Sequence, residues 1–266
     1  MHKLLDGKKG IIFGALDDKS IAWKIAEKAR EAGATFTLSN APVALRMGKI
    51  NELAEQCNTK VIAADATKVD ELEALVDQSV ELLGGKLDFI VHSIGMSPNV
   101  RKKRHYTDLN YDYYLKTLDV SAASFHKVLQ TAYKKEAMND WGSILALSYI
   151  AAQKVFPDYG DMADAKAALE SIARSFGYHF GVRNKVRVNT VSQSPTATTA
   201  GSGVTGFDRF FDYADKMSPL GNASAESCAE FCISLLADHS KMITMQNLFH
   251  DGGFSNMGMN PALLDW

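Results

Sequence analysis

Short apolar runs alternate with longer amphipathic segments along this chain, and that alternation constrains the fold more than any other feature. The apolar runs have the length of buried strands and lie at 10–13, 35–38, 60–64, 89–92, 143–147, 186–191 and 245–250. The clearest segments with helical spacing lie between them, at 20–32, 69–83, 111–137, 163–180 and 225–237. Strands that alternate with helices predict βαβ units, whose right-handed crossovers give a parallel sheet with helices on both faces. We therefore expect an α/β fold, with a single doubly wound domain and a seven-stranded parallel sheet.

The composition excludes several classes of function. A formal net charge of −2 gives no field that would attract nucleic acid or anionic lipid, and no apolar run approaches the ~20 residues that span a bilayer. The first residues lack the apolar stretch of a signal peptide. Three cysteines form no C-x-x-C pair, so we expect neither disulfides nor a zinc site, and a reducing compartment is favoured. The prediction is a cytoplasmic protein with no metal ion and no nucleic-acid or membrane partner.

The first predicted strand ends at Gly14, and a short turn leads to a predicted helix at Ser20. A glycine lets the backbone turn tightly and lets a phosphate approach, while the N–H groups and dipole of the helix favour an anion. Only Gly14 remains of the G-x-G-x-x-G pattern. On this segment alone, a simple turn capped by Ser20 is therefore an alternative interpretation.

Three more strand ends bear on a nucleotide. Asp65 follows the third strand, where its carboxylate could accept a hydrogen bond from an adenine amine, and Gly95 follows the fourth, where it gives a ribose access to the backbone. The second strand ends at 39–42 without a carboxylate for a ribose 2′-hydroxyl. The first basic residue after it is Arg46, so a 2′-phosphate has no obvious partner either. The pattern favours NADH, with NADPH as the alternative.

Two tyrosines and a lysine follow the fifth strand. Tyr149 stands at the carboxyl end of that strand, and Tyr159 precedes Lys166 by seven residues, about two helical turns. Tyr159 and Lys166 share a face if the predicted helix already includes Tyr159. A lysine beside a bound ribose supplies a fixed positive charge, which lowers the cost of negative charge near a tyrosine oxygen. Spacing alone leaves open that all three are solvated surface side chains.

The order of several short motifs makes the resemblance specific. The chain resembles the type I enoyl-acyl-carrier-protein reductases, a divergent branch of the short-chain dehydrogenase/reductases. The similar motifs run nearly end to end, at Gly14, 20–22, Asp65, 92–95, 147–149, 157–159, 165–167, 186–189, 202–203 and 251–255. The resemblance implies a Rossmann-like domain that transfers hydride from NADH to the β carbon of a trans-2-enoyl thioester. It also implies an acyl carrier protein as the partner that carries the substrate, and a homotetramer.

The resemblance also implies roles for individual residues. Tyr159 is expected to donate a hydrogen bond to the thioester carbonyl, Lys166 to hold the nicotinamide ribose, and Tyr149 to be a second active-site tyrosine. Ser97 is expected to contact substrate through its main chain. The residues expected at the nucleotide are Gly14, Ser20, Ile21, Asp65, Ala66, Ser93, Ile94, Gly95, Pro195, Thr196 and Thr198. A mobile substrate-binding loop is expected over about 199–216.

The chain departs from the family pattern in places. Ser194 stands where the family often has glycine, so we expect its side chain to narrow the cofactor cleft or to add a hydroxyl donor. The loop keeps one basic residue, Arg209, where relatives often have several to meet an acidic carrier protein. The basic run at 101–105 is either a solvated loop or a rim that meets the carrier protein or a cofactor phosphate.

Two other functions compete with this interpretation. A short-chain carbonyl (3-oxoacyl) reductase places its tyrosine four residues before the lysine, and here that position is Met162, a thioether that cannot donate a proton. A nucleotide-binding sensor with a vestigial site is the second alternative. The presence of Tyr149, Tyr159 and Lys166 together argues against it.

Overall fold

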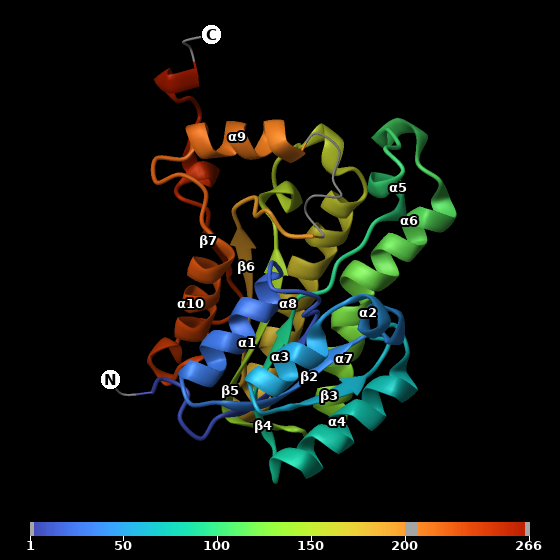
Figure 1. Cartoon of the computed structure of the whole chain (residues 1–266), viewed down its shortest axis with the longest axis vertical. Coiled ribbons are helices and arrows are strands. Elements are labelled where there is room, and N and C mark those ends of the chain that lie inside the picture. Colours follow the sequence, from blue (N-terminus) through green and yellow to red (C-terminus); the bar gives the residue numbers. More distant parts are fainter. Residues whose placement is uncertain (1–2, 200–206, 264–266) are drawn as a thin grey trace.

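Seven strands form one sheet in the computed structural model, which describes residues 3–199 and 207–263. Their order is β3-β2-β1-β4-β5-β6-β7, and every neighbouring pair is parallel (Figure 1). The strands are β1 Lys9–Phe13, β2 Thr35–Asn40, β3 Lys60–Ala63, β4 Leu87–His92, β5 Met138–Ser148, β6 Arg187–Gln193 and β7 Asn247–His250. The strand order reverses between β1 and β4, which creates the switch point where such sheets bind ligands. The expected doubly wound α/β fold is confirmed.

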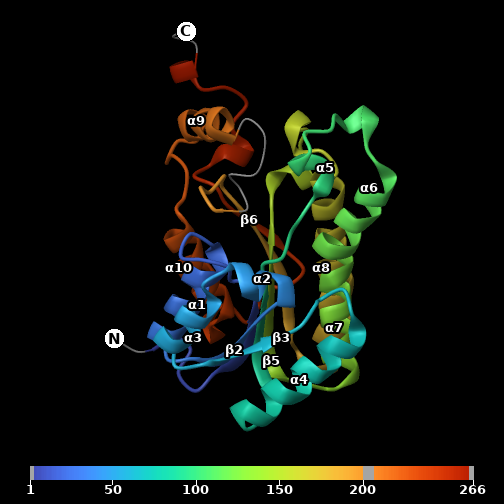
Figure 2. The same cartoon turned by 45° about the vertical axis from the view of Figure 1, so that its right-hand side comes forward.

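Helices cover both faces of the sheet. They are α1 Ile21–Glu31, α2 Pro42–Met47, α3 Ile50–Gln56, α4 Val69–Leu83, α5 Pro98–Arg101, α6 Tyr111–Leu118, α7 Ser124–Lys134, α8 Met162–Asn184, α9 Phe207–Met217 and α10 Ala225–Leu236. Figure 2 shows α1, α3 and α10 on one face and α4, α7 and α8 on the other.

Burial on both faces explains why the central strands β1 and β4 are largely apolar. Along β4, Phe89 and Val91 pack with α1 and α10, while Ile90 packs with α4 and α7 on the opposite face. Along β1, Ile12 belongs to the first of these cores and Ile11 to the second. Since successive side chains of a strand point to opposite faces, a parallel sheet covered on both sides favours nearly continuous apolar runs.

The helix expected over 111–137 is interrupted. It consists of α6 and α7, joined by a π-helical turn over Asp119–Ala123. In that turn the Ser121 hydroxyl accepts a hydrogen bond from the Met96 N–H at 2.9 Å. Turns of this kind insert one extra residue and often occur at functional sites. Here the turn brings a helix side chain against the backbone that follows β4.

Membrane-spanning helices, metal sites and disulfides were not expected from the sequence. Within 3–199 and 207–263, no helix is long and apolar enough to cross a membrane. The same residues contain no group of three or more His, Cys, Asp or Glu side chains placed to hold a metal ion. All three cysteines, Cys57, Cys228 and Cys232, are free and buried.

Candidate active site

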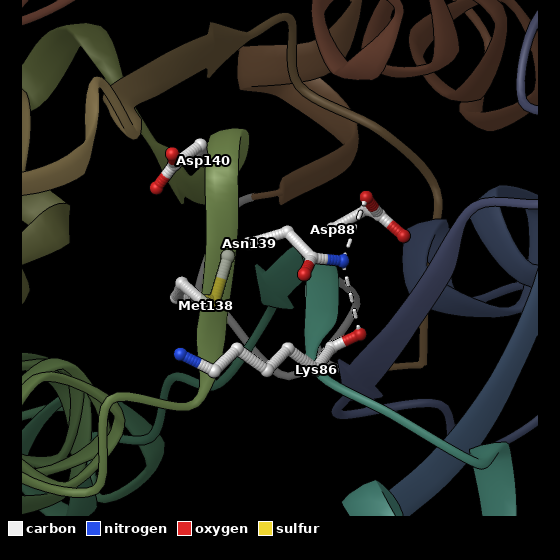
Figure 3. Close-up of a pocket in the computed structure, with 5 residues that line it drawn as sticks. All are labelled: Lys86, Asp88, Met138, Asn139 and Asp140. Carbon is white, nitrogen blue, oxygen red and sulfur yellow. Dashed lines mark hydrogen bonds between the residues drawn. The ribbon is translucent and has the colours of Figure 1, made fainter.

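The candidate site lies at the carboxyl edge of the sheet, where β1, β4, β5 and β6 end and which helices α5 and α9 flank (Figure 1). A separate depression, lined by Lys86, Asp88, Met138, Asn139 and Asp140, lies at the amino ends of β4 and β5 (Figure 3). It is on the opposite edge of the sheet. None of the residues expected at the active site lines it.

Gly14 makes the turn after β1, and only glycine fits there. Its φ of +95° lies in the left-handed region, and an added Cβ would lie 2.1 Å from the Ser93 carbonyl oxygen. The Gly14 N–H donates to the Ser39 carbonyl at 3.0 Å. The turn after β1 is therefore packed directly on the backbone after β4, at the switch point of the sheet.

Ser20 stands at the N-cap position of α1, and its side chain shapes the turn that leads into the helix. Its hydroxyl donates to the Asp17 carbonyl at 2.8 Å and accepts from the Leu16 N–H at 3.3 Å. It makes no capping bond to α1, which begins at Ile21. Ser20 therefore holds the N-cap position without a side-chain capping bond, and its hydroxyl is used in the turn. The positive end of an 11-residue helix faces the carboxyl edge, an arrangement that favours an anion.

Asp65, with Ala66 beside it, lies in the turn after β3. Its carboxylate accepts hydrogen bonds from the Thr67 N–H at 3.0 Å and the Thr67 hydroxyl at 2.7 Å. Partial burial opposes ionisation, but these hydrogen bonds and the charges of Lys68 and Lys127 lower the pKa of Asp65 below its usual value. An ionised acceptor therefore stands at the position expected for the adenine.

The turn after β4 meets helix α8. Ser93 donates its N–H to the Phe13 carbonyl at 3.3 Å, and Ile94 and Gly95 follow. A Cβ added at Gly95 would lie 3.4 Å from Met162 Cε and 3.8 Å from Lys166 Nζ. The structure thus brings the turn expected at the ribose beside the lysine expected to hold it.

Lys166 is buried in this corner. Its ammonium donates to the Leu147 carbonyl at 2.7 Å, at the end of β5. Burial lowers the pKa of Lys166 to about 8, and the nearby Glu170 carboxylate opposes that shift. Glu170 is buried too, and it accepts from the Ser148 hydroxyl at 2.7 Å. The end of β5 is therefore held by two successive turns of α8.

Tyr159 does not belong to the helix that carries Lys166. It ends a 3₁₀ turn over Pro157–Tyr159, and α8 begins at Met162. Gly160 separates the two elements with a φ of +52°, a left-handed value that a right-handed helix cannot contain. The predicted helix does not include Tyr159, so the condition under which Tyr159 and Lys166 would share a helical face is not met. Tertiary packing brings Tyr159 to the site.

The two tyrosines lie against each other. Their ring centroids are 4.9 Å apart with the planes inclined at 49°. Tyr149 is buried, and its hydroxyl has no hydrogen-bond partner within the described part of the chain. Burial raises the pKa of both phenols above the ordinary tyrosine value. Both groups therefore remain neutral proton donors at neutral pH.

An aromatic wall closes the outer side of the tyrosine pair. The Phe156 ring lies 5.5 Å from the Tyr149 ring, and Phe210 of α9 lies 6.2 Å from it and edge-on. Phe254 completes the wall 6.1 Å from Phe156. Of the loop expected over 199–216, residues 200–206 lie outside the described residues. From Phe207 onward the chain is helical and supplies Phe210 to this wall.

The segment expected at the nicotinamide follows β6 and is held by a side chain that sequence reasoning missed. The side-chain Nε2 of Gln193 donates to the Thr196 hydroxyl at 3.2 Å, and its Oε1 accepts from His250 Nδ1 at 2.8 Å. Further along, the Thr198 N–H donates to the Thr196 carbonyl at 2.7 Å. A glutamine at 193 alone gives no sign of this pairing, because its partner is 57 residues away.

Ser194 differs from expectation. The residue is buried, and its hydroxyl accepts from the Ala223 N–H at 3.1 Å, so its side chain braces the loop before α10. It therefore neither narrows a cleft nor offers a donor there. Ser97 also uses its hydroxyl inside the protein, where it donates to Asp161 at 2.6 Å. Its main chain remains the part expected to meet substrate.

A doubly wound sheet with a glycine turn at its switch point, and two tyrosines and a buried lysine on the same edge, is typical of nucleotide-dependent short-chain reductases. The comparisons with known proteins narrow this class. A family model described as "Enoyl-(Acyl carrier protein) reductase" matches residues 14–255. The chain belongs to that family, as its motifs indicated.

Three relatives illustrate the match. The chain is 35% identical over 261 residues to "Enoyl-[acyl-carrier-protein] reductase [NADH] 1" of Rhizobium meliloti, covering 97% of this chain and 94% of that one. The structure of a FabI–NADH complex from Alistipes finegoldii is 62% identical with a TM-score of 0.98, covering 99% and 93%. The NADH-dependent enzyme of Aquifex aeolicus is 29% identical with a TM-score of 0.88, covering 97% and 100%.

Proposed function

We propose that this protein is an NADH-dependent enoyl-acyl-carrier-protein reductase, which converts a trans-2-enoyl thioester to the saturated acyl thioester. The observation that carries this proposal is the pair of packed, neutral phenols, the buried Tyr149 and the partly exposed Tyr159, with Lys166 holding the adjacent strand end. The relatives named as NADH-dependent enoyl reductases support it.

The nucleotide edge fits a dinucleotide. At Gly14, a Cβ would fill the space beside the Ser93 backbone, so the backbone itself lines the turn. The N-terminus of α1 would hold the pyrophosphate, Asp65 would accept from the adenine amine, and Lys166 would donate to the nicotinamide ribose. When bound, NADH supplies the hydride for the β carbon of the substrate.

The end of β2 favours a nucleotide without a 2′-phosphate. Asn40 donates its amide to the Ala15 carbonyl at 2.9 Å, and its Oδ1 accepts from the Ala41 N–H at 2.9 Å. A hydrogen-bonded amide thus occupies the position where a basic side chain would bind the phosphate. The names of the relatives agree with NADH.

Hydride addition to the β carbon leaves an enolate whose charge is on the thioester oxygen, and a proton delivered to the α carbon then gives the saturated acyl thioester. Tyr159 donates a hydrogen bond to that oxygen, and its raised pKa keeps the proton in place until charge develops. The Lys166 ammonium stabilises the same charge through the field, which is strong because the corner is buried. Tyr149 and the aromatic wall exclude water from the acyl chain.

A carbonyl reductase is the weaker alternative. It needs a phenol four residues before the lysine, and the side chain there, Met162, is buried with its Sδ 3.6 Å from the Ser121 hydroxyl. A thioether cannot donate a proton to a developing alkoxide. The site therefore supports reduction of a carbon–carbon double bond.

The proposed partner is an acyl carrier protein, as the name of the family indicates. A homotetramer and a cytoplasmic location are further parts of the proposal. Three free, buried cysteines are consistent with a reducing compartment.

The test is loss of NADH absorbance with purified protein, run with a crotonyl thioester and with an acetoacetyl thioester. We expect turnover of the crotonyl substrate, and NADH in preference to NADPH. Turnover of the acetoacetyl thioester alone would establish the carbonyl reductase instead. Absence of hydride transfer to either substrate would contradict both.

A further inference from the structure

Asp161, the residue before helix α8, is fully buried. Its hydrogen-bond donors within the described residues are all neutral: the Ser97 hydroxyl at 2.6 Å, the Asn99 amide at 2.8 Å and the Thr117 hydroxyl at 2.9 Å. A buried carboxylate is costly unless hydrogen bonds and dipoles compensate it. The N-terminal end of the 23-residue helix α8 supplies a favourable dipole.

These donors come from two separate elements that border the candidate site. Ser97 and Asn99 lie at the start of α5, directly after the turn that contains Gly95, and Thr117 lies in α6. The Ser97 hydroxyl also accepts from the Val100 N–H at 2.9 Å and so caps α5. One carboxylate thus fixes the α5 turn and α6 to the segment that leads into α8.

The tyrosine turn is joined to the same point. Tyr159 precedes Asp161 by two residues, and the intervening Gly160 packs on Val100, since a Cβ added at Gly160 would lie 3.3 Å from Val100 Cγ2. The turn that carries Tyr159 and the start of α5 therefore approach closely, and two hydrogen bonds to Asp161 join them.

We propose that Asp161 is a positioning residue, which holds Tyr159 and the Ser97 main chain in fixed relation on two sides of the enoyl thioester. The inference rests on the proposed function and extends it. Tyr159 meets the thioester oxygen, while Ser97 is the expected main-chain contact to the substrate. A small relative shift of the two turns would misplace the phenol, and such a misplacement by about 1 Å can lower turnover about 10²-fold.

A carboxylate suits this position better than an amide. Oδ1 accepts from Ser97, and Oδ2 accepts from Asn99 and shares the Thr117 proton with the Tyr113 carbonyl. In Asp161→Asn, one oxygen still accepts on the Asn99 side, but the NH₂ group faces the Ser97 hydroxyl. In Asp161→Ala all three donors lose their acceptor. The two variants therefore remove the connection in graded steps.

The test compares both variants with Asp164→Asn. Asp164 is also on α8 but accepts from the exposed Tyr106 hydroxyl at 3.1 Å, so it serves as the matched control. For Asp161→Ala we expect kcat to fall about thirtyfold and KM for crotonyl thioester to rise about fivefold, with NADH affinity changed by less than about twofold. Asp161→Asn should lie between this variant and wild type, and the control should match wild type.

Two results would overturn the proposal. One is wild-type kcat and KM in folded Asp161→Ala, and the other is a loss of NADH affinity in parallel with kcat, which a general structural defect would cause. If Asp161→Ala does not fold, Asp161→Asn provides the same comparison.

A second measurement does not depend on turnover. Amide hydrogen exchange over 97–100 and 157–161 should accelerate in the Asp161 variants and not in the control. Unchanged exchange would overturn the positioning role whatever the activity. An inactive wild type with accelerated exchange in the variants would refute only the proposed function.

Discussion

The two walls of the candidate site are built from different parts of the chain. The nucleotide wall is mainly backbone: Gly14 packs on the Ser93 carbonyl, and the N-terminus of α1 faces the same edge. The proposed catalytic wall is made of side chains, the buried Tyr149 and Lys166 and the partly exposed Tyr159. Substitutions damage a backbone wall where they add a Cβ, whereas they damage a side-chain wall where they change the chemical group. Substitutions can therefore separate binding from turnover.

Lys166 joins the two walls, so its loss should have the largest effect. In Lys166→Ala, we expect turnover to fall about a thousandfold and NADH affinity to fall at least about tenfold, since the field at the thioester oxygen and the ribose donor disappear together. Steady-state kinetics and NADH fluorescence titration measure the two effects. The exposed Lys154→Ala is the control. Normal NADH binding and normal turnover in Lys166→Ala would refute the assignment of both roles.

Gly14→Ala should damage the nucleotide wall alone. The new Cβ would lie 2.1 Å from the Ser93 oxygen, so the turn must move, and we expect NADH affinity to fall about a hundredfold. Gly84→Ala is a matched control, because Gly84 also has a positive φ but nothing lies within 4 Å of its Cβ position. If the two substitutions lowered NADH affinity equally, the loss would come from backbone strain and not from the close contact with the Ser93 oxygen.

Tyr159→Phe should damage the catalytic wall alone. We expect kcat to fall about thirtyfold, the size of one hydrogen bond to a developing charge, with NADH affinity retained. Tyr106→Phe removes an exposed phenol that bonds to Asp164 and should be silent. A Tyr159→Phe enzyme with normal kcat would show that this hydroxyl does not meet the substrate oxygen.

The pH profile tests the charge that serves both walls. With a pKa of about 8, Lys166 is an ammonium below that pH and loses its charge above it. We therefore expect kcat/KM to decline as the pH rises through about 8, well before an ordinary lysine would titrate. Glu170→Gln removes the carboxylate that raises this pKa, so it should move the decline to lower pH. A profile that stays flat through this range would contradict the lowered pKa of Lys166.

The smallest expected effect concerns the support of the 195–199 segment. Gln193→Ala removes the amide that holds Thr196, and we expect NADH affinity to fall about threefold, as for loss of one neutral hydrogen bond. The control is Ser227→Ala, which removes a 3.3 Å hydrogen bond to Nε2 of His250, the ring nitrogen that does not bond to Gln193. An affinity unchanged in Gln193→Ala would mean that the segment is held without it.

Hydrophobic periodicity predicted the sheet and most helices because a buried strand appears in the sequence as a short apolar run, and an amphipathic helix as apolar residues at helical spacing. The boundaries that it missed depend on tertiary contacts. The π-helical turn at 119–123 is set by Ser121 meeting the Met96 backbone, and the break before α8 is set by the backbone of Gly160. Neither leaves a periodic signal in the sequence.

The motifs predicted which side chains gather at the carboxyl edge, but not what holds them. Asp161 and its three donors are separated by 44 to 64 residues, and Gln193 is 57 residues from His250. These polar pairs follow from how the elements pack. Of these residues, Glu170 was the easiest to predict from the sequence, because an acidic residue one helical turn after Lys166 lies on the same face of the helix.

Strand order also bears on how the protein matures on the ribosome. Strand β7 is synthesised after every other strand of the sheet, yet its His250 supplies the proton donor that holds Gln193. Until β7 pairs with β6, a nascent chain already contains its tyrosines and its lysine but lacks this brace. We therefore expect full coenzyme affinity to be among the last properties that the protein acquires, once β7 has paired with β6 and the brace at Gln193 has formed.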